Sequence, residues 1–263
     1  MGGSFRLRWG LEGALKRTVG RNVPWIAVGN TIDREKKMNI GRTIASICML
    51  TLAACAHTPE ATEVKVDKFW FIFLETGKKT PDDKELVGKM QRGHIDNFKR
   101  LHGENKLFAA GPLQDPSTLK RGIVVAKAPS NEVLKTYFQP DEYVREGYMT
   151  LNAMPAVAHR ALESQGIDPN GIEEVRIIQI LRASPAAATG DAKANSAFLQ
   201  ALIDKGTVGA WYSVESGSLS EVLFSRTTDT KMLEDTFAQY PATKSGDATV
   251  AVWRQWLGKG VVK

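Results

Sequence analysis

The chain has 263 residues, enough to bury one large hydrophobic core or two small ones. Residues 1–55 hold nine of the 35 Lys and Arg and three of the 29 Asp and Glu, a balance of +6, so residues 56–263 are neutral overall. A neutral body argues against nucleic-acid binding, which depends on neutralising phosphates with excess positive charge.

A short apolar segment after Met38 has the plan of an export signal. Arg42 precedes an uncharged run over residues 43–52, and small residues follow it. The run is shorter than the roughly 20 residues that a membrane-spanning helix requires. We therefore expect residues 38–54 to be a signal peptide. Residues 1–37, which show no clear period, are expected to be an unstructured upstream extension from a misassigned start codon.

Only two cysteines occur, Cys48 and Cys55, too few for a disulfide framework or a thiolate metal site. The run Leu52-Ala53-Ala54-Cys55 resembles the bacterial lipobox, in which the cysteine is acylated and becomes the first residue. The resemblance implies anchoring to the lipid bilayer through acylated Cys55, since several acyl chains hold a protein stably. Ala56, where an aspartate favours the inner membrane, indicates the outer membrane and a periplasm-facing protein. Residues 55–66 are then a tether.

Residues 67–158 predict the order strand, helix, strand, strand, helix, strand. The expected elements are strand 67–75, a helix opened by Thr80 and Pro81 and ending near Gly103, strands 106–110 and 121–126, helix 130–138 and strand 147–157. In the long helix, apolar residues recur at helical spacing, namely Leu86, Met90, Phe98 and Leu101. His94 lies on the same stripe and therefore points inward or into a cleft.

The same order recurs in residues 172–263, after a linker expected at 159–171. The second set comprises strand 173–181, helix 191–205, strands 207–214 and 218–225, helix 229–240 and strand 248–256. Repetition after about 100 residues indicates a duplicated domain. The fold class is then α+β, with two tandem ferredoxin-like (βαββαβ) domains whose sheets are antiparallel. The bare faces of the two sheets could cover each other, giving an internal pseudo-dimer.

Two motifs of the first copy resemble the YCII-related domain family. The first motif consists of Gly93, His94, Phe98, Leu101, His102, Leu107, Gly111 and Pro112, and the second runs from Asp141 to Tyr148. Glu142 stands where the family usually has proline. The resemblance implies a ferredoxin-like, typically dimeric fold, with a histidine and an aspartate as the active pair. Some relatives are linked to lyase or dehalogenation chemistry on ring compounds.

Carried over to this chain, the resemblance implies that His94 and Asp141 are catalytic. A carboxylate beside an imidazole fixes its tautomer and makes it a better base. One reading is lyase or isomerase-like acid–base chemistry on a small cyclic or carbonyl compound. The other is a non-catalytic module of the cell envelope that binds a small ligand or a protein. In that case His94 is a core histidine and Asp141 caps a turn.

The second copy departs from this pattern. Asn195 takes the position of His94, and Tyr240 takes that of Asp141. Because an asparagine cannot act as a base near neutral pH, we expect residues 172–263 to be a degenerate copy with a structural role.

A cleft is expected beside the first copy's motif. Gly111 and Pro112 end a strand there, and Trp211 and Tyr212 fill the matching region of the second copy. We expect these four residues to line it. The four histidines lack metal-ligand spacing, so no metal and no cofactor are expected.

Overall fold

The computed structural model describes residues 67–184 and 191–263. The expected extension, the signal peptide, Cys55 and the tether lie outside these ranges. Within them, no helix combines the length and the apolar character that a membrane crossing requires.

The described chain forms eight strands and six helices. The first half contains β1 (Lys68–Thr76), α1 (Lys84–Gly103), β2 (Leu107–Gln114), β3 (Lys120–Ala128), α2 (Asn131–Tyr137), α3 (Glu142–Arg145) and β4 (Met149–Arg160). The second contains β5 (Asp168–Arg182), α4 (Ala192–Asp204), β6 (Ala210–Ser216), β7 (Leu219–Ser225), α5 (Thr230–Phe237), α6 (Pro241–Lys244) and β8 (Ala248–Lys259). The expected order is present in each half, with two additions. A short helix, α3 or α6, precedes each last strand, and β4 and β5 extend into the expected linker.

The strands close into one antiparallel barrel in the order β1-β3-β2-β8-β5-β7-β6-β4. The α+β class and the antiparallel pairing are thus confirmed. Two seams join the halves. Leu113 pairs with Gln255 between β2 and β8, and Ala156 pairs with Val214 between β4 and β6. Closure gives each of the eight described strands a neighbour on both sides, whereas an open sheet exposes two edges.

Side chains alternate between the barrel interior and the helix-covered outer faces. On β1, Phe71 and Phe73 point inward and contact each other edge to face, with ring centroids 5.0 Å apart. Trp70, Ile72 and Leu74 point outward and pack against the helices. Consecutive aromatics in the sequence of this strand therefore serve two separate cores.

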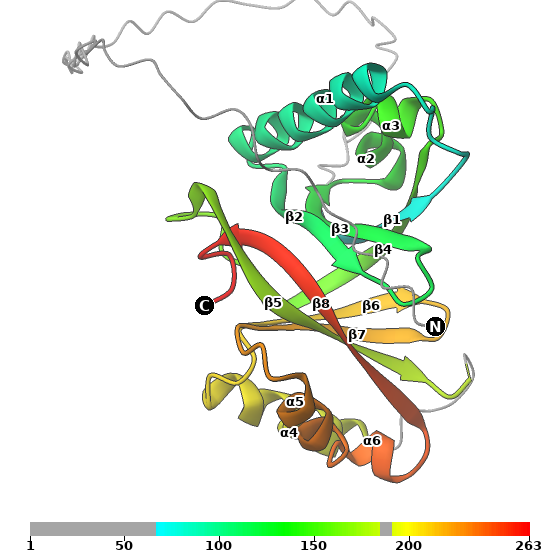
Figure 1. The fold of residues 1–263 in the computed structure, drawn as a ribbon. Coiled ribbons are helices and arrows are strands. Elements are labelled where there is room, and N and C mark those ends of the chain that lie inside the picture. The colour runs from blue at the N-terminus through cyan, green and yellow to red at the C-terminus, as the bar shows by residue number, and fades with distance from the viewer. Residues whose placement is uncertain (1–66, 185–190) are drawn as a thin grey trace, which may run out of the picture. The chain divides into compact units, whose positions relative to one another are not determined.

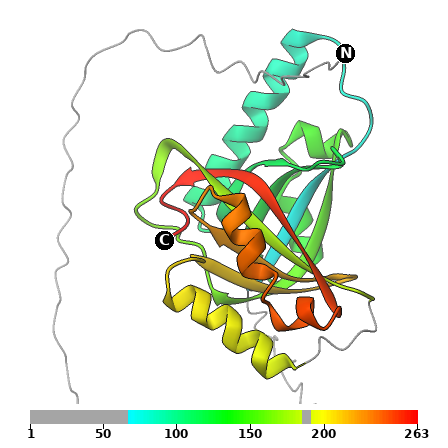
Figure 2. The same cartoon turned by 60° about the horizontal axis from the view of Figure 1, so that its bottom comes forward.

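Each half of the barrel carries its own layer of helices (Figures 1 and 2). Helices α1, α2 and α3 cover the outer face of the first half, where Met90, Leu101 and Leu134 are buried. Helices α4, α5 and α6 cover the outer face of the second, where Leu199 and Phe237 are buried. The barrel wall separates these outer cores from the interior core.

Helix α1 begins later than the sequence suggested. Asp83, rather than Thr80, caps it, because its Oδ1 accepts hydrogen bonds from the backbone N–H of Glu85 (2.9 Å) and Leu86 (3.2 Å). A carboxylate satisfies the free donors of a first turn and also suits the positive end of the helix dipole. The expected apolar stripe is confirmed, and His94 is buried along it.

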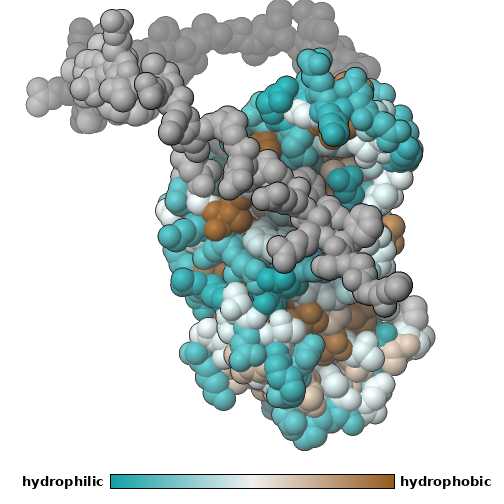
Figure 3. Space-filling model, viewed as in Figure 1, coloured by the Kyte–Doolittle hydropathy of each residue, from teal (hydrophilic) through white to brown (hydrophobic). Residues whose placement is uncertain are grey.

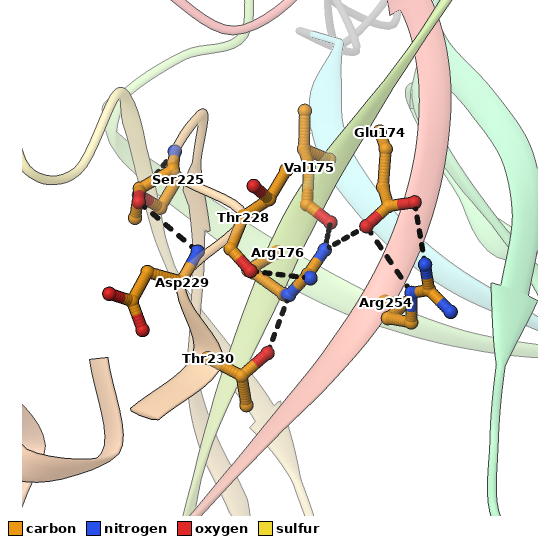
Figure 4. Close-up of polar contacts among 9 residues, drawn as sticks. Glu174, Val175, Arg176, Ser225, Thr228, Asp229, Thr230 and Arg254 are labelled. Atoms are coloured by element: carbon orange, nitrogen blue, oxygen red, sulfur yellow. Dashed lines mark hydrogen bonds and ion pairs between the residues drawn. The ribbon is translucent and has the colours of Figure 1, made fainter. Parts of the chain in front are cut away.

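A buried arginine fastens the loop before α5 to strand β5 (Figure 4). Arg176 donates hydrogen bonds to the carbonyl of Thr228 (2.6 Å), to Oγ1 of Thr230 (2.8 Å) and to Oε1 of Glu174 (2.7 Å). Arg254 donates two more to the same carboxylate. Hydrogen bonds from Arg254 and Arg176 hold the pKa of Glu174 below its usual value. The loop is thereby fixed by charge-assisted contacts.

The face of the molecule drawn in Figure 3 is mostly hydrophilic, with small separate hydrophobic patches. The large hydrophobic side chains that are exposed in the described ranges are Ile95, Leu119, Val157, Ile172 and Met232. Because they are scattered over the chain's elements, they do not by themselves indicate a docking surface.

Candidate functional site

The structure brings His94 and Asp141 together. His94 lies on α1, and Asp141 directly precedes α3. Nδ1 of His94 is 2.5 Å from Oδ2 of Asp141, and only 7% of His94 and 0% of Asp141 are exposed. A carboxylate buried this deeply requires hydrogen-bond donors around it, and the imidazole supplies one of them. Their role in chemistry stays a prediction.

Local capping explains where Asp141 points. Its Oδ1 accepts a hydrogen bond from the backbone N–H of Tyr143 (3.0 Å), which makes Asp141 the N-cap of α3. The second oxygen, Oδ2, is left to face α1. Since Oδ2 is an acceptor, Nδ1 of His94 carries a proton, and in the neutral ring the lone pair is then on Nε2.

The Nε2 atom of His94 is the part of the pair that can meet another molecule. No hydrogen-bond partner contacts Nε2 in the described part of the chain. The side-chain atoms that are both enclosed and without a partner do not include Nε2, so this atom is not enclosed. The small exposed fraction of the residue therefore includes Nε2. In this pair, Nδ1 of His94 is bonded to a buried carboxylate and Nε2 lies at the surface.

Aromatic rings hold the imidazole in place. The ring of Phe98 lies 4.3 Å from that of His94, and the ring of Tyr143 meets it edge-on at 5.7 Å. Burial raises the pKa of Tyr143, and the nearby charge of Arg121 opposes that shift. Cζ of Arg121 is 6.0 Å from the Tyr143 ring. Sequence reasoning did not assign Tyr143 or Arg121 to the site, although Tyr143 belongs to the second motif.

In the second half, the first turn of the short helix α6 is capped by a side chain of the long helix α4. Oδ1 of Asn195, on α4, accepts a hydrogen bond from the backbone N–H of Ala242 (3.1 Å) in the first turn of α6. Tyr240, the N-cap of α6, makes no side-chain capping bond. The side chain of Asn195 thus caps the first turn of α6, as the side chain of Asp141 caps that of α3. An amide bonded in this way offers no base.

The expected cleft is wrong, because its four residues do not converge on His94. Trp211 lies in the outer core of the second half, while Tyr212 lies in the barrel interior. They are consecutive strand residues and so point to opposite sides of the wall. Gly111 and Pro112 lie at the β2–β8 seam. A Cβ on Gly111 would sit 1.8 Å from the Trp256 carbonyl oxygen, and the Pro112 carbonyl accepts a hydrogen bond from Gln255.

Within residues 67–184 and 191–263, no three His, Cys, Asp or Glu side chains gather in a way that could hold a metal ion. The expectation that the protein uses neither metal nor cofactor stays a prediction. Two shallow surface hollows, one beside Asp83 and Arg92 and the other beside Asp229 and Thr236, contain neither His94 nor Asp141.

Comparison with known proteins bears on the fold. No model of a known protein family matches the sequence, and no curated protein does. Among solved structures, a candidate monooxygenase from Fusobacterium nucleatum superposes with a TM-score of 0.50 at 8% identity, over 75% of this chain and 96% of that chain.

Two further structures are less similar. A candidate monooxygenase from Lactobacillus acidophilus gives a TM-score of 0.43 at 9% identity, over 72% of this chain and 92% of that one. A heme-binding protein from Thermus thermophilus gives 0.44 at 10% identity, over 74% and 91%. At such low identity the likeness shows fold and not function. The order of elements, the closed antiparallel barrel and the likeness to the Fusobacterium structure together give the described chain a ferredoxin-like α–β barrel fold.

Proposed function

We propose that His94 and Asp141 form an acid–base site of lyase or isomerase type that acts on a small cyclic or carbonyl compound, as in a YCII-like domain. One observation carries the proposal. Nδ1 of His94 is held on a buried carboxylate, while Nε2 has no partner among the described residues and reaches the surface. This is the arrangement that a positioned general base requires.

The proposed reaction follows from the neutral His94 ring that carries its proton on Nδ1 and its lone pair on Nε2. Nε2 of His94 takes a proton from a carbon next to a carbonyl group, and the electron pair of that C–H bond moves into the carbonyl as an enolate. Asp141 stabilises the imidazolium that results. Return of the proton at another carbon completes an isomerisation. Departure of a β-substituent with its bonding electrons completes an elimination instead.

A second candidate, a binding module without turnover, is favoured by a different observation. Asn195 in the second half holds the short helix α6 with no group that could transfer a proton. The same position can therefore serve packing alone. In that case His94 fastens Asp141 and α3 to α1, and any ligand or envelope protein binds unchanged.

Turnover separates the two candidates. The full chain is screened on ring lactones and halogenated hydroxy-aromatics, alongside His94→Gln and Asp141→Asn. His102→Gln is the matched control, because His102 lies on the same helix and makes no contact with Asp141. The proposal requires a substrate that the wild type and the control convert and the other two variants do not. Conversion that survives His94→Gln would remove His94 from the chemistry, and absence of conversion by the wild type would favour the binding module.

We further propose that the two halves are copies of one domain and that residues 172–263 are a degenerate copy. The recurring order of elements and the matched positions of His94 and Asn195 support this. The barrel would then be an internal pseudo-dimer within one chain.

Attachment to the bilayer through acylated Cys55 belongs to the same proposal. Its support is the resemblance of Leu52-Ala53-Ala54-Cys55 to a lipobox, preceded by a short apolar run. The barrel would face the periplasm, with residues 55–66 as a tether, and the outer membrane is the expected location.

A further inference from the structure

A cation lies beside the His94 site, on the far side of the Tyr143 ring from no more than one ring's reach. Cζ of Arg121, near the start of β3, is 6.0 Å from the centre of that ring, and the imidazole of His94 meets the same ring at 5.7 Å. Tyr143 itself is only 2% exposed, so its position is fixed by packing. A guanidinium and an imidazole therefore both adjoin one fixed aromatic ring.

A β-bulge directs Arg121 to this place. In the pairing of β1 with β3, Leu74 is opposite Gly122 and the next residue, Glu75, is opposite Lys120, so Arg121 is an extra residue in the ladder. Its side chain reaches the helix-covered outer face, where the ring that it contacts belongs to the outer core. Bulges re-aim side chains in this way and are frequent beside active sites.

The guanidinium of Arg121 is unoccupied among the described residues. It takes part in none of their ion pairs or side-chain hydrogen bonds. The enclosed side-chain atoms that lack a partner do not include its nitrogens, so all three nitrogens reach solvent. A half-buried arginine in this state offers a planar fork of donors, the geometry that binds a carboxylate through two parallel hydrogen bonds.

The charges around the imidazole permit an anion here. Asp141 is 0% exposed and is bonded to Nδ1 of His94, on the opposite side of the ring from Nε2. Its carboxylate therefore does not contact a molecule that meets Nε2. Such a molecule finds a lone pair on Nε2 and a positive charge on Arg121, both open to solvent.

We propose that the substrate of the His94 site is a carbonyl compound that also carries a carboxylate, and that Arg121 binds this carboxylate. This substrate class rests on the proposed acid–base function. Arg121 holds the carboxylate while Nε2 of His94 meets the carbon beside the carbonyl group. The C–H bond breaks there, its proton moves to Nε2, and its electron pair enters the carbonyl group as an enolate. Arg121 neither gives nor takes a proton and serves as a binding residue.

Arg92 provides a matched control. It lies on α1 two residues before His94, a spacing that places the two side chains on different faces of the helix. Its Nη1 lies beside Gly88, 3.6 Å from the position of a Cβ on that glycine. Arg92 is exposed and takes part in no ion pair of the described residues. Arg92→Met therefore removes an equal charge near His94 and leaves the proposed carboxylate site intact.

NMR titration of the full chain, observed on the imidazole signals of His94, tests the site. The probes are levulinate, a small keto acid anion, and its uncharged methyl ester, and His94→Gln assigns the signals. We expect levulinate to shift them saturably and the ester to bind about tenfold or more weakly, since it lacks the charge-assisted contact. Arg121→Met should weaken levulinate to a similar degree, and Arg92→Met should leave its affinity unchanged.

Three results would overturn the proposal. The first is no saturable shift of the His94 signals by levulinate. The second is an ester that binds as tightly as levulinate, and the third is an equal loss of affinity in Arg92→Met. Thermal unfolding verifies that each variant folds, and Arg121→Gln decides the matter if Arg121→Met does not.

Failure of this site and failure of the acid–base function give different results. The titration needs no turnover, so lost carboxylate binding leaves the conversion assays of His94→Gln and Asp141→Asn unaffected. Conversely, levulinate that binds through Arg121 without any conversion by the wild type would retain the carboxylate site and remove the acid–base function.

Discussion

His94 donates from Nδ1 to Oδ2 of Asp141 across 2.5 Å, and this contact ties the long helix α1 to the first turn of α3. The matching contact in the second half runs from the backbone N–H of Ala242 to Oδ1 of Asn195. Both halves therefore fasten a short helix to a long one at the same place. Only the first half does so with a group that can transfer a proton.

Asp141 is expected to have two separable roles. Asp141→Ala removes the cap of α3 and leaves Nδ1 of His94 buried without a partner, so it should lower the free energy of unfolding by about 2–4 kcal/mol. In Asp141→Asn, Oδ1 can still accept from Tyr143 and the amide can donate to Nδ1. That variant should lose about 1 kcal/mol or less by the same reasoning. Urea denaturation measures both, and equal losses would contradict the assignment.

Gly111 is expected to be irreplaceable at the β2–β8 seam. A Cβ there would lie 1.8 Å from the backbone oxygen of Trp256, so the strands must separate locally. Gly111→Ala should destabilise by about 1–3 kcal/mol. Gly93→Ala is the control, because a Cβ on Gly93 meets nothing within 4 Å and a helix prefers alanine by about 0.5–1 kcal/mol. Thermal unfolding should move in opposite directions for the two variants.

Glu221 is expected to make stability fall as pH rises. Burial raises the pKa of Glu221 above its usual 4.5, and hydrogen bonds from Trp211 and Ser213 oppose the shift. The protonated form is thus favoured in the folded state. Its contribution is complete below pH 4.5 and is lost as pH rises through the folded-state pKa.

Glu221→Gln keeps an acceptor for Trp211 and cannot ionise. The stability of wild type relative to this variant should therefore decrease with rising pH above 4.5, in urea titrations over a pH series. A difference that is constant or that increases with pH would contradict the assignment.

Cys55 is expected to hold the protein at the membrane. Fractionation of cells that express the whole chain should place the wild type with the membranes and Cys55→Ser in the soluble fraction, because two or more acyl chains give stable attachment. Cys48→Ser lies upstream of the expected cut and should behave as wild type does. If Cys55→Ser stays with the membranes, anchoring through this residue is wrong.

Local signals in the sequence predicted most of the elements. The apolar stripe with His94 on it and the recurring order of strands and helices needed only periodicity. Capping was harder, because Thr80 and Asp83 both offer a side-chain acceptor and only the carboxylate engages the first turn. The short helices α3 and α6 were missed because four residues carry no period.

Long-range relationships could not be predicted in the same way. The pairing of Leu113 with Gln255 joins residues 142 positions apart, and no local pattern encodes such a register. The error at Trp211 and Tyr212 was avoidable, since consecutive strand residues cannot face the same cleft. The bulge that directs Arg121 outward depends on how β3 pairs with β1, and that register was not visible in the sequence.

The central claim is that His94 presents a base at Nε2 because Asp141 holds its Nδ1 proton. Carbethoxylation of the folded chain with diethyl pyrocarbonate, mapped by mass spectrometry, tests it directly, because the reagent needs a reachable nitrogen lone pair. In Asp141→Asn the amide donates to Nδ1, which moves the ring proton to Nε2. We expect His94 to be modified in the wild type and protected in Asp141→Asn. An unmodified His94 in the wild type, or equal modification in both proteins, would contradict the account.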